Sequence, residues 1–175
     1  VSQEIESVCP TFVGACVEAY VENSPYCKEL WDEINALGEK FKSSLTTESL
    51  KEISGIAATR KVYRACGKDP SRYRPASEAL IRRMLQGKEL YQRDTLVDLV
   101  NLASIAYGYS IGGFDADKFE GDSLRAASVH VNLLAAQRFH YRSVGFTEVP
   151  LQLASPCAER RERREIHALL FARLQ

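Results

Sequence analysis

Few side chains in this 175-residue chain have the type and spacing that nucleophilic or metal chemistry requires. The three histidines, His130, His140 and His167, are scattered, and each is interpreted as a surface or core-edge residue. Five cysteines are present without a Cys-x-x-Cys pair, so a structural zinc site is not expected. Cys157 has no His or Asp at an informative spacing, which argues against a catalytic thiol. We assign no catalytic residue and expect reduced cysteines in a cytoplasmic protein.

The acidic pair Asp115 and Asp117 could suggest a cation site, because carboxylates are ligands for hard metal ions. However, Asp-x-Asp-Lys at a turn more often caps backbone N–H groups, and Lys118 would neutralise the site. We therefore predict a structural role for both carboxylates, with no metal and no cofactor. Asp98 and Asn101 lie three apart on an apolar helix, and we expect them to hydrogen-bond inward from a shared face.

A local group of basic and aromatic residues lies between positions 72 and 93. Lys plus Arg and Asp plus Glu balance at 23 each, so any nucleic-acid site must be a local patch. Arginine side chains suit phosphates, and tyrosine rings can stack on unpaired bases. The alternative is a solvated helix face on which Arg82 and Arg83 pair with acids. The RNA-binding candidates are Arg72, Tyr73, Arg74, Arg82, Arg83, Lys88 and Arg93, with Tyr91 beside them.

Hydrophobic periodicity predicts the helices that must position these residues. Apolar residues at three- and four-residue spacing indicate helices over 27–45, 56–66, 75–85 and 95–107, and shorter helical segments over 2–8 and 46–53. Within the third of these helices, Glu78 is interpreted as a carboxylate at the positive end of the helix dipole. The charged run 159–165 is interpreted as a self-paired exposed helix.

Strands are predicted over 11–21, 109–114 and 123–129. The apolar segments 131–139 and 166–174 leave helix and strand open. No stretch approaches 18 consecutive apolar residues, so no membrane-spanning helix is expected. The predicted fold class is α+β, a single compact domain over 1–175 with helices packed on mixed or antiparallel β-sheets.

Four short motifs occur in a fixed order. Arg74 to Leu80 reads RPASEAL, Leu96 to Leu102 reads LVDLVNL, Gly112 to Lys118 reads GGFDADK, and Gly121 to Arg125 reads GDSLR. Together they resemble the tRNA-binding and editing (B-three/B-four) domain of the phenylalanyl-tRNA synthetase beta chain. The chain is still more similar to free-standing proteins built from that domain alone. The resemblance covers roughly residues 1–127, and only fragments match over 128–175.

The resemblance implies a cytoplasmic protein that binds tRNA, with no membrane partner. It also implies a substrate pocket beside Gly112, Gly113 and Phe114, where the synthetase domain hydrolyses mischarged tRNA. This chain departs from the family pattern, because Gly112 replaces a pocket histidine and Tyr91-Gln92 replaces an Arg-Pro pair. The acidic Gly-Gly-Glu segment has no counterpart after Ser128.

Two functions therefore remain open. One is a trans-acting aminoacyl-tRNA editing deacylase, and the other is a non-catalytic RNA- or protein-binding module that retains the fold without the editing pocket. No ATP- or amino-acid-activating motif is present, so the chain is not a complete synthetase. A homo-oligomer is left open.

Overall fold

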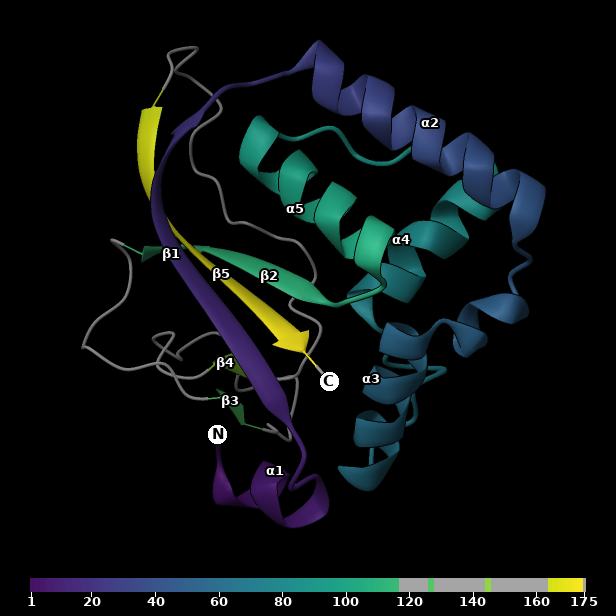
Figure 1. Ribbon diagram of the computed structural model, residues 1–175, viewed down its shortest axis with the longest axis vertical. Helices are drawn as coiled ribbons and strands as arrows, with labels where there is room; N and C mark the ends of the chain where they lie inside the picture. The colour runs from purple at the N-terminus through teal and green to yellow at the C-terminus, as the bar shows by residue number, and fades with distance from the viewer. Residues whose placement is uncertain (117–125, 128–143, 146–163, 175) are drawn as a thin grey trace.

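A three-stranded antiparallel sheet brings the two ends of the chain together (Figure 1). The computed structural model describes residues 1–116, 126–127, 144–145 and 164–174. The strand order is β1 (Val13–Asn23), β5 (Arg164–Leu174) and β2 (Ile111–Asp115). β1 and β5 pair along their whole lengths, from Val13 opposite Leu174 to Asn23 opposite Arg164. Two further strands of two residues each, β3 (Ala126–Ala127) and β4 (Val144–Gly145), pair in parallel.

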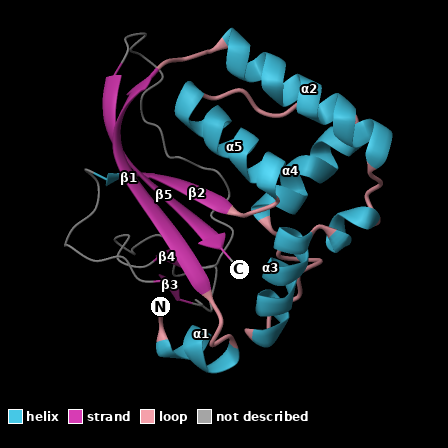
Figure 2. Cartoon of the chain, in the orientation of Figure 1, coloured by secondary structure: helices cyan, strands magenta, loops and turns pink. Residues whose placement is uncertain are grey.

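The helices are α1 (Gln3–Val8), α2 (Lys28–Ser44), the 3₁₀ turn η1 (Ser49–Glu52), α3 (Ser54–Ala65), α4 (Ala76–Leu85) and α5 (Thr95–Tyr107). Those from α2 to α5 gather on one side of the sheet, whereas α1 lies near the start of β1, as Figure 2 shows. α5 contacts α2, α4 and β2, so it connects the helical layer to the sheet. The α+β fold class predicted from the sequence is confirmed.

The core of the helical layer is an aliphatic cluster to which every helix from α2 to α5, and η1, contributes. Its buried members are Ile34, Leu50, Ile56, Ile81, Met84 and Ile105. Burying one such side chain stabilises the fold by roughly 1.5–3 kcal/mol, before the entropy of ordering is subtracted. This cluster therefore fixes the relative positions of α3 and α4, on which the candidate site described below depends.

Gly108 is the point where three helices meet before the chain enters β2. Its φ of 71° is the left-handed conformation that ends many helices, and it follows the last residue of α5. The Ser77 hydroxyl of α4 donates to the Gly108 carbonyl at 3.0 Å. A Cβ on Gly55 of α3 would lie 2.7 Å from the same carbonyl oxygen, so only glycine fits there.

The opposite end of α5 is attached to the sheet through its first turn. Asp94 caps the helix by accepting from the Val97 N–H at 2.9 Å. Asn23, the last residue of β1, accepts from the Leu96 N–H through Oδ1 at 3.0 Å. These two side chains satisfy backbone donors that a helix start leaves unpaired, so they hold α5 against the end of β1.

Asp98 joins α5 to α2 from within the protein. The residue is only 1% exposed, and its Oδ2 accepts from Trp31 Nε1 at 2.7 Å. Its Oδ1 accepts from the Arg93 N–H at 3.3 Å. Burial raises the pKa of this carboxyl, although both hydrogen bonds act in the opposite direction. Asn101 is also buried, as expected for a residue one helical turn further along.

The predicted element boundaries are close to those observed for α2, α3, α4 and β1, and they are identical for α5. Segment 166–174, which periodicity left undecided, is the central strand β5. The helix predicted over 159–165 is wrong at Arg164 and Glu165, which belong to β5, and its other residues lie outside the described ones. Of the predicted strand over 123–129, only Ala126–Ala127 is described, and it is a strand. No helix among the described residues is long and apolar enough to cross a membrane.

The Trp31–Asp98 hydrogen bond gives a first test. Asp98→Ala leaves the part-buried indole N–H without its acceptor, so the free energy of unfolding should fall by roughly 1–3 kcal/mol. Trp31→Phe removes the donor, and the double variant should lose less than the sum of the two single losses. Urea unfolding of the three variants measures this coupling. Asp32→Ala, which removes an exposed ion pair with Lys28, serves as the control and should change stability little. Strictly additive losses would contradict the contact.

Candidate functional site

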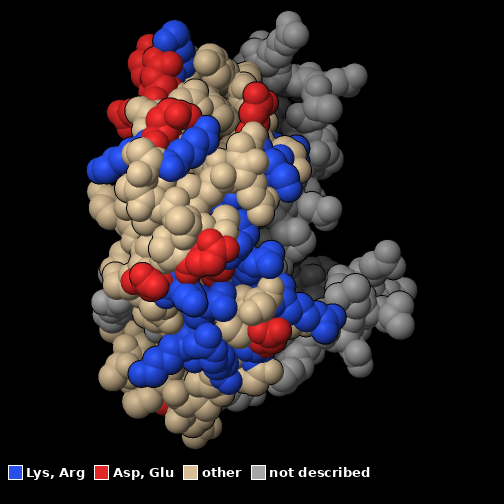
Figure 3. All heavy atoms as spheres, turned by 90° about the vertical axis from the view of Figure 1, so that its right-hand side faces the viewer, with Lys and Arg blue, Asp and Glu red and all other residues tan. Residues whose placement is uncertain are grey.

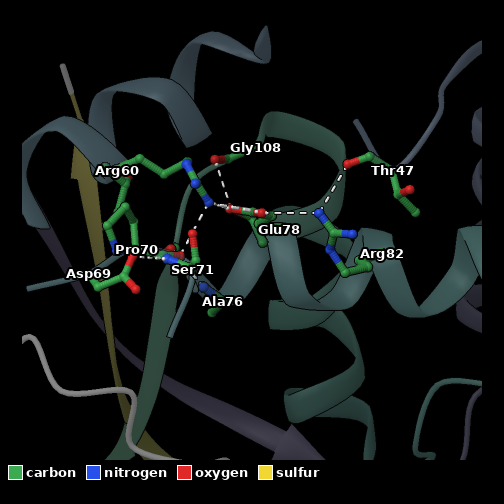
Figure 4. Close-up of polar contacts among 12 residues, drawn as sticks. Thr47, Arg60, Asp69, Pro70, Ser71, Ala76, Glu78, Arg82 and Gly108 are labelled. Carbon is green, nitrogen blue, oxygen red and sulfur yellow. Dashed lines mark hydrogen bonds and ion pairs between the residues drawn. The ribbon is translucent and has the colours of Figure 1, made fainter. Parts of the chain in front are cut away.

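A buried carboxylate, Glu78, lies at the centre of a group of polar residues between α3 and α4 (Figure 4). Only 2% of the residue is exposed. Arg60 Nη1 donates to both of its carboxylate oxygens, at 2.8 and 3.1 Å, and to the Pro70 carbonyl at 3.2 Å. Arg82 Nη2 lies 3.5 Å from the same carboxylate and donates to the Thr47 carbonyl at 3.0 Å. Glu78 therefore links α3, the loop before α4, and the segment before η1.

The sequence places these residues by simple helical spacing. Glu78 and Arg82 are four apart on α4, so they lie one above the other on one face. Arg60 is four residues after Ile56 and three before Tyr63, both buried on α3, so its aliphatic stem follows the buried face of that helix. The sequence pattern places Glu78 at the positive end of the helix dipole and does not single out Arg60. Arg60 falls at helical spacing from the apolar residues of α3, and this spacing is the signal that could have identified it.

A small depression opens to solvent beside this cluster. Its volume is about 180 Å³. The residues that line it are Thr47, Glu48, Lys51, Arg60, Ser71, Arg74, Glu78 and Arg82. Four cationic side chains and two carboxylates face it, so the formal charge of its lining is +2. Of the predicted RNA-binding residues, this depression unites only Arg74 and Arg82.

Arg83 lies on a tyrosine ring near the end of α4. Its guanidinium carbon is 4.2 Å from the centroid of Tyr91, and its Nε donates to the Glu89 carbonyl at 2.6 Å. Tyr91 remains 66% exposed. An arginine stacked on an exposed ring presents a flat, positively charged surface, which is the type of surface that unpaired bases and phosphates bind.

A similar arrangement surrounds Tyr73 before the start of α4. Arg72 lies 5.4 Å from the centroid of this ring, and the Lys68 ammonium lies 5.9 Å from it. Lys68 is largely buried, and burial lowers the pKa of its ammonium group. The Arg72 side chain belongs to an exposed residue. Tyr73 therefore lies within reach of two cations from the connection between α3 and α4.

The predicted basic group is thus distributed along α4 and is not one patch. Arg72 and Arg74 precede the helix, Arg83 and Lys88 lie at its far end, and Arg82 between them is occupied by Glu78 and Thr47. The alternative in which arginines pair with acids holds for Arg82, whereas Arg83 contacts a carbonyl and a ring. Arg93 and Lys88 are exposed. Figure 3 shows Lys and Arg side chains gathered across the lower half of the face that carries α3, with a few carboxylates between them.

The predicted substrate pocket residues lie on β2. A Cβ added to Gly112 would lie 3.0 Å from Cε2 of Phe114, because residues two apart in a strand project from the same face. The ring therefore occupies the space beside Gly112 that we expected to be open. Gly112, Gly113 and Phe114 pair with Phe171, Leu170 and Leu169 of β5.

The remaining predictions concern the acidic pair, the histidines and Cys157. Asp115 is the last residue of β2, and Asp117 lies outside the described residues. Among the residues that the structure describes, no group of three or more His, Cys, Asp or Glu side chains could hold a metal ion. The structural role of Asp117 stays a prediction. His167 is in β5, and His130, His140 and Cys157 lie outside the described residues.

The ion pair between Arg60 and Glu78 leads us to expect that substitutions of these two residues have non-additive effects on the free energy of unfolding. Arg60→Met leaves the Glu78 carboxylate buried with a single distant cation, so unfolding free energy should fall by about 3–5 kcal/mol. The double variant Arg60→Met/Glu78→Met removes the uncompensated charge and should be more stable than Arg60→Met alone. Thermal and urea unfolding measure both. Lys42→Met, which breaks the exposed pair with Glu39, is the control and should have a small effect. A double variant no more stable than Arg60→Met would contradict this account.

The covered position of Gly112 gives a third test. Gly112→Val forces its side chain against the Phe114 ring, so the free energy of unfolding should fall by about 1–3 kcal/mol. Combining it with Phe114→Ala removes the clash, so the added loss caused by valine should shrink in that background. Urea unfolding of the two single variants and the double variant measures the effect. If Gly112→Val alone melts like the parent, the ring leaves an open pocket and our interpretation is wrong.

One comparison with known proteins finds a match that overlaps these sites. A family model, the B3/4 domain, matches residues 58–138. The matched range begins on α3 just before Arg60 and includes α4, α5 and β2. No curated protein and no solved structure gave a significant match. Glu78, Arg60, Arg82 and both tyrosine–cation contacts thus lie within the range that matches the model of the B3/4 domain, a domain found in the phenylalanyl-tRNA synthetase beta chain.

Proposed function

We propose that this protein binds tRNA through the surface that surrounds α4. The observation that carries the proposal is the pair of arginine–tyrosine contacts, Arg72 on Tyr73 and Arg83 on Tyr91, one at each end of that helix. Both contacts lie inside the range that matches the B3/4 domain. An arginine fixed on a ring loses little conformational freedom when it contacts a phosphate, since the ring already restricts it.

The spacing of the two contacts also suits an extended ligand. α4 has ten residues, which at 1.5 Å per residue separates its ends by roughly 15 Å. A small ligand in one pocket would not reach both ends, whereas a nucleic-acid backbone would. Tyr91, with most of its surface exposed, offers a face on which an unpaired base can stack.

The charge balance of the whole chain sets the expected strength of binding. The 23 basic and 23 acidic residues cancel, so there is no long-range attraction for a polyanion from net charge. Binding must then depend on a few local contacts, and each contact releases counterions from the RNA. We therefore expect weak affinity that decreases as salt concentration rises.

Editing hydrolysis is the alternative function of the same family, and the described residues support it less. Such hydrolysis requires a pocket that orients the ester and a water molecule. At Gly112, which replaces the family's pocket histidine, the Phe114 ring lies 3.0 Å from where a side chain would begin. We therefore propose the binding function, and treat deacylation of mischarged tRNA as a separate measurement on the same protein.

The binding proposal predicts a change in salt dependence. Replacing Arg72 and Arg83 with Ala should weaken binding of deacylated tRNA and lower the slope of log affinity against log salt by about two, one for each lost phosphate contact. Fluorescence anisotropy at several salt concentrations measures both quantities. These arginines are preferable to Arg82, whose loss would also disturb Glu78.

The matched control is Lys28→Ala/Lys42→Ala, which removes two positive charges from α2. Both lysines form exposed ion pairs there, and the control should keep the parental slope. The proposal fails if the parent shows no salt-dependent binding, or if the arginine variant and the lysine control behave alike.

A further inference from the structure

We propose that the depression beside Glu78 is a site for a single phosphate group. This site is separate from the two tyrosine rings, and the binding proposal above uses none of its four cations, which are Lys51, Arg60, Arg74 and Arg82. The chemistry is the same whether the phosphate is a free anion or one unit of an RNA backbone, and the two sources are separated by experiment below.

The lining of the depression has a net positive charge. The buried carboxylate of Glu78 already has two arginine partners, so it does not compete for the exposed cations at the rim. Glu48 is the other carboxylate, and a hydrogen bond from the Thr47 hydroxyl lowers the pKa of Glu48, so it stays negative near neutral pH. The lining retains a formal charge of +2, which a doubly charged phosphate would balance.

The depression also offers hydrogen-bond donors that no described residue occupies. Within the described part of the chain, Lys51 and Arg74 form no ion pair, and both are exposed. Thr47 and Glu78 engage only Nη2 of Arg82, and the buried Nε of Arg82 has no hydrogen-bond partner among the described residues. An arginine fork with spare donors, a lysine and the nearby Ser71 side chain form the type of donor set that phosphate oxygens require.

The volume of the depression limits the size of the ligand that it can hold. Its volume of about 180 Å³ is well below the roughly 300–1,000 Å³ of pockets that hold drug-sized molecules, yet several times the space that one water molecule occupies. A phosphate group fits this range, whereas a nucleoside would extend beyond it.

The framework is already in place before any ligand binds. Arg60 and Arg82 are held by Glu78, and Arg82 is also held by the Thr47 carbonyl (Figure 4). Ser71 is held in a tight turn, because its N–H donates to Asp69 Oδ1 at 2.8 Å. Ordering these groups in advance lowers the entropy lost when an anion binds.

The test uses inorganic phosphate as the probe, at constant ionic strength set with chloride. Amide resonances in the 47–51 and 71–74 segments should shift in a saturable manner. Lys51→Ala/Arg74→Ala should weaken phosphate binding by roughly tenfold or more, because two charge-assisted contacts are lost. Both residues are exposed, so this variant should melt close to the parent. Lys28→Ala/Lys42→Ala removes the same charge elsewhere and should bind phosphate like the parent.

A second arm identifies the source of the phosphate. If Lys51→Ala/Arg74→Ala also lowers the salt slope of tRNA binding, the site holds one backbone phosphate. If phosphate binding falls while the slope for tRNA does not change, the site takes a free phosphate or phosphomonoester, and the inference stands even if tRNA binding fails. An absence of saturable shifts in the parent, or equal weakening by the two double variants, would overturn the inference.

Discussion

The buried carboxylate of Glu78 is the constraint on which the candidate surface depends. A carboxylate that is 2% exposed is stable only when cations and donors replace its hydration, and here Arg60 and Arg82 do so from two different helices. The result is a fixed orientation of α4 relative to α3. That orientation places the loop with Arg72 and Tyr73 on one side of Glu78 and the segment with Arg83 and Tyr91 on the other. Hydrophobic packing of Ile56 and Ile81 holds the same two helices together, but aliphatic contacts are less selective about register than a charged pair.

Asp98 is also a buried carboxylate, but it is stabilised by a different kind of partner. Burial raises its pKa, and among the described residues its hydrogen-bond partners are the neutral indole of Trp31 and one backbone N–H, with no cation. Glu78 has cationic partners, and Asp98 has only dipolar ones. The helical layer therefore contains two buried acids held in distinct ways, one by ion pairs between α3 and α4 and one by hydrogen bonds between α2 and α5. Each links α4 or α5 to a helix from an earlier part of the chain.

Helical periodicity anticipated most of the helical layer because each of those helices packs one apolar stripe on a shared core. α5 is the clearest case, with an Asp94 cap and a left-handed Gly108 at its ends that local rules predict directly. β5 could not be predicted in the same way. It is the central strand, its run Ile166 to Phe171 is almost continuously apolar, and such a run carries neither the helical nor the alternating period. Its partner strands are also distant in sequence, so no local signal specifies the pairing.

The site was less predictable than the fold for a related reason. Sequence analysis could group the basic residues from 72 to 93, but charge alone does not say which cations are consumed by buried acids. Arg82 lies four residues from Glu78 on the same helix, but only the approach of α3 to α4 shows that Arg60, outside the predicted group, is the second arginine that pairs with Glu78. Gly112 is a similar case, since the space that a missing side chain leaves is filled by the residue two positions along the same strand face.

The cations of this surface fall into two groups. Some hold the fold together, and the others remain available to bind an anion. Arg60 and Arg82 balance internal charge, so they contribute donors and potential to the depression but cannot move toward a ligand without exposing Glu78. Lys51, Arg72, Arg74 and Arg83 are attached to the same framework and have no ion pair among the described residues. A nearly neutral chain can in this way present a localised basic surface, because its acids are used to fix some arginines in place while others stay free to meet an anion.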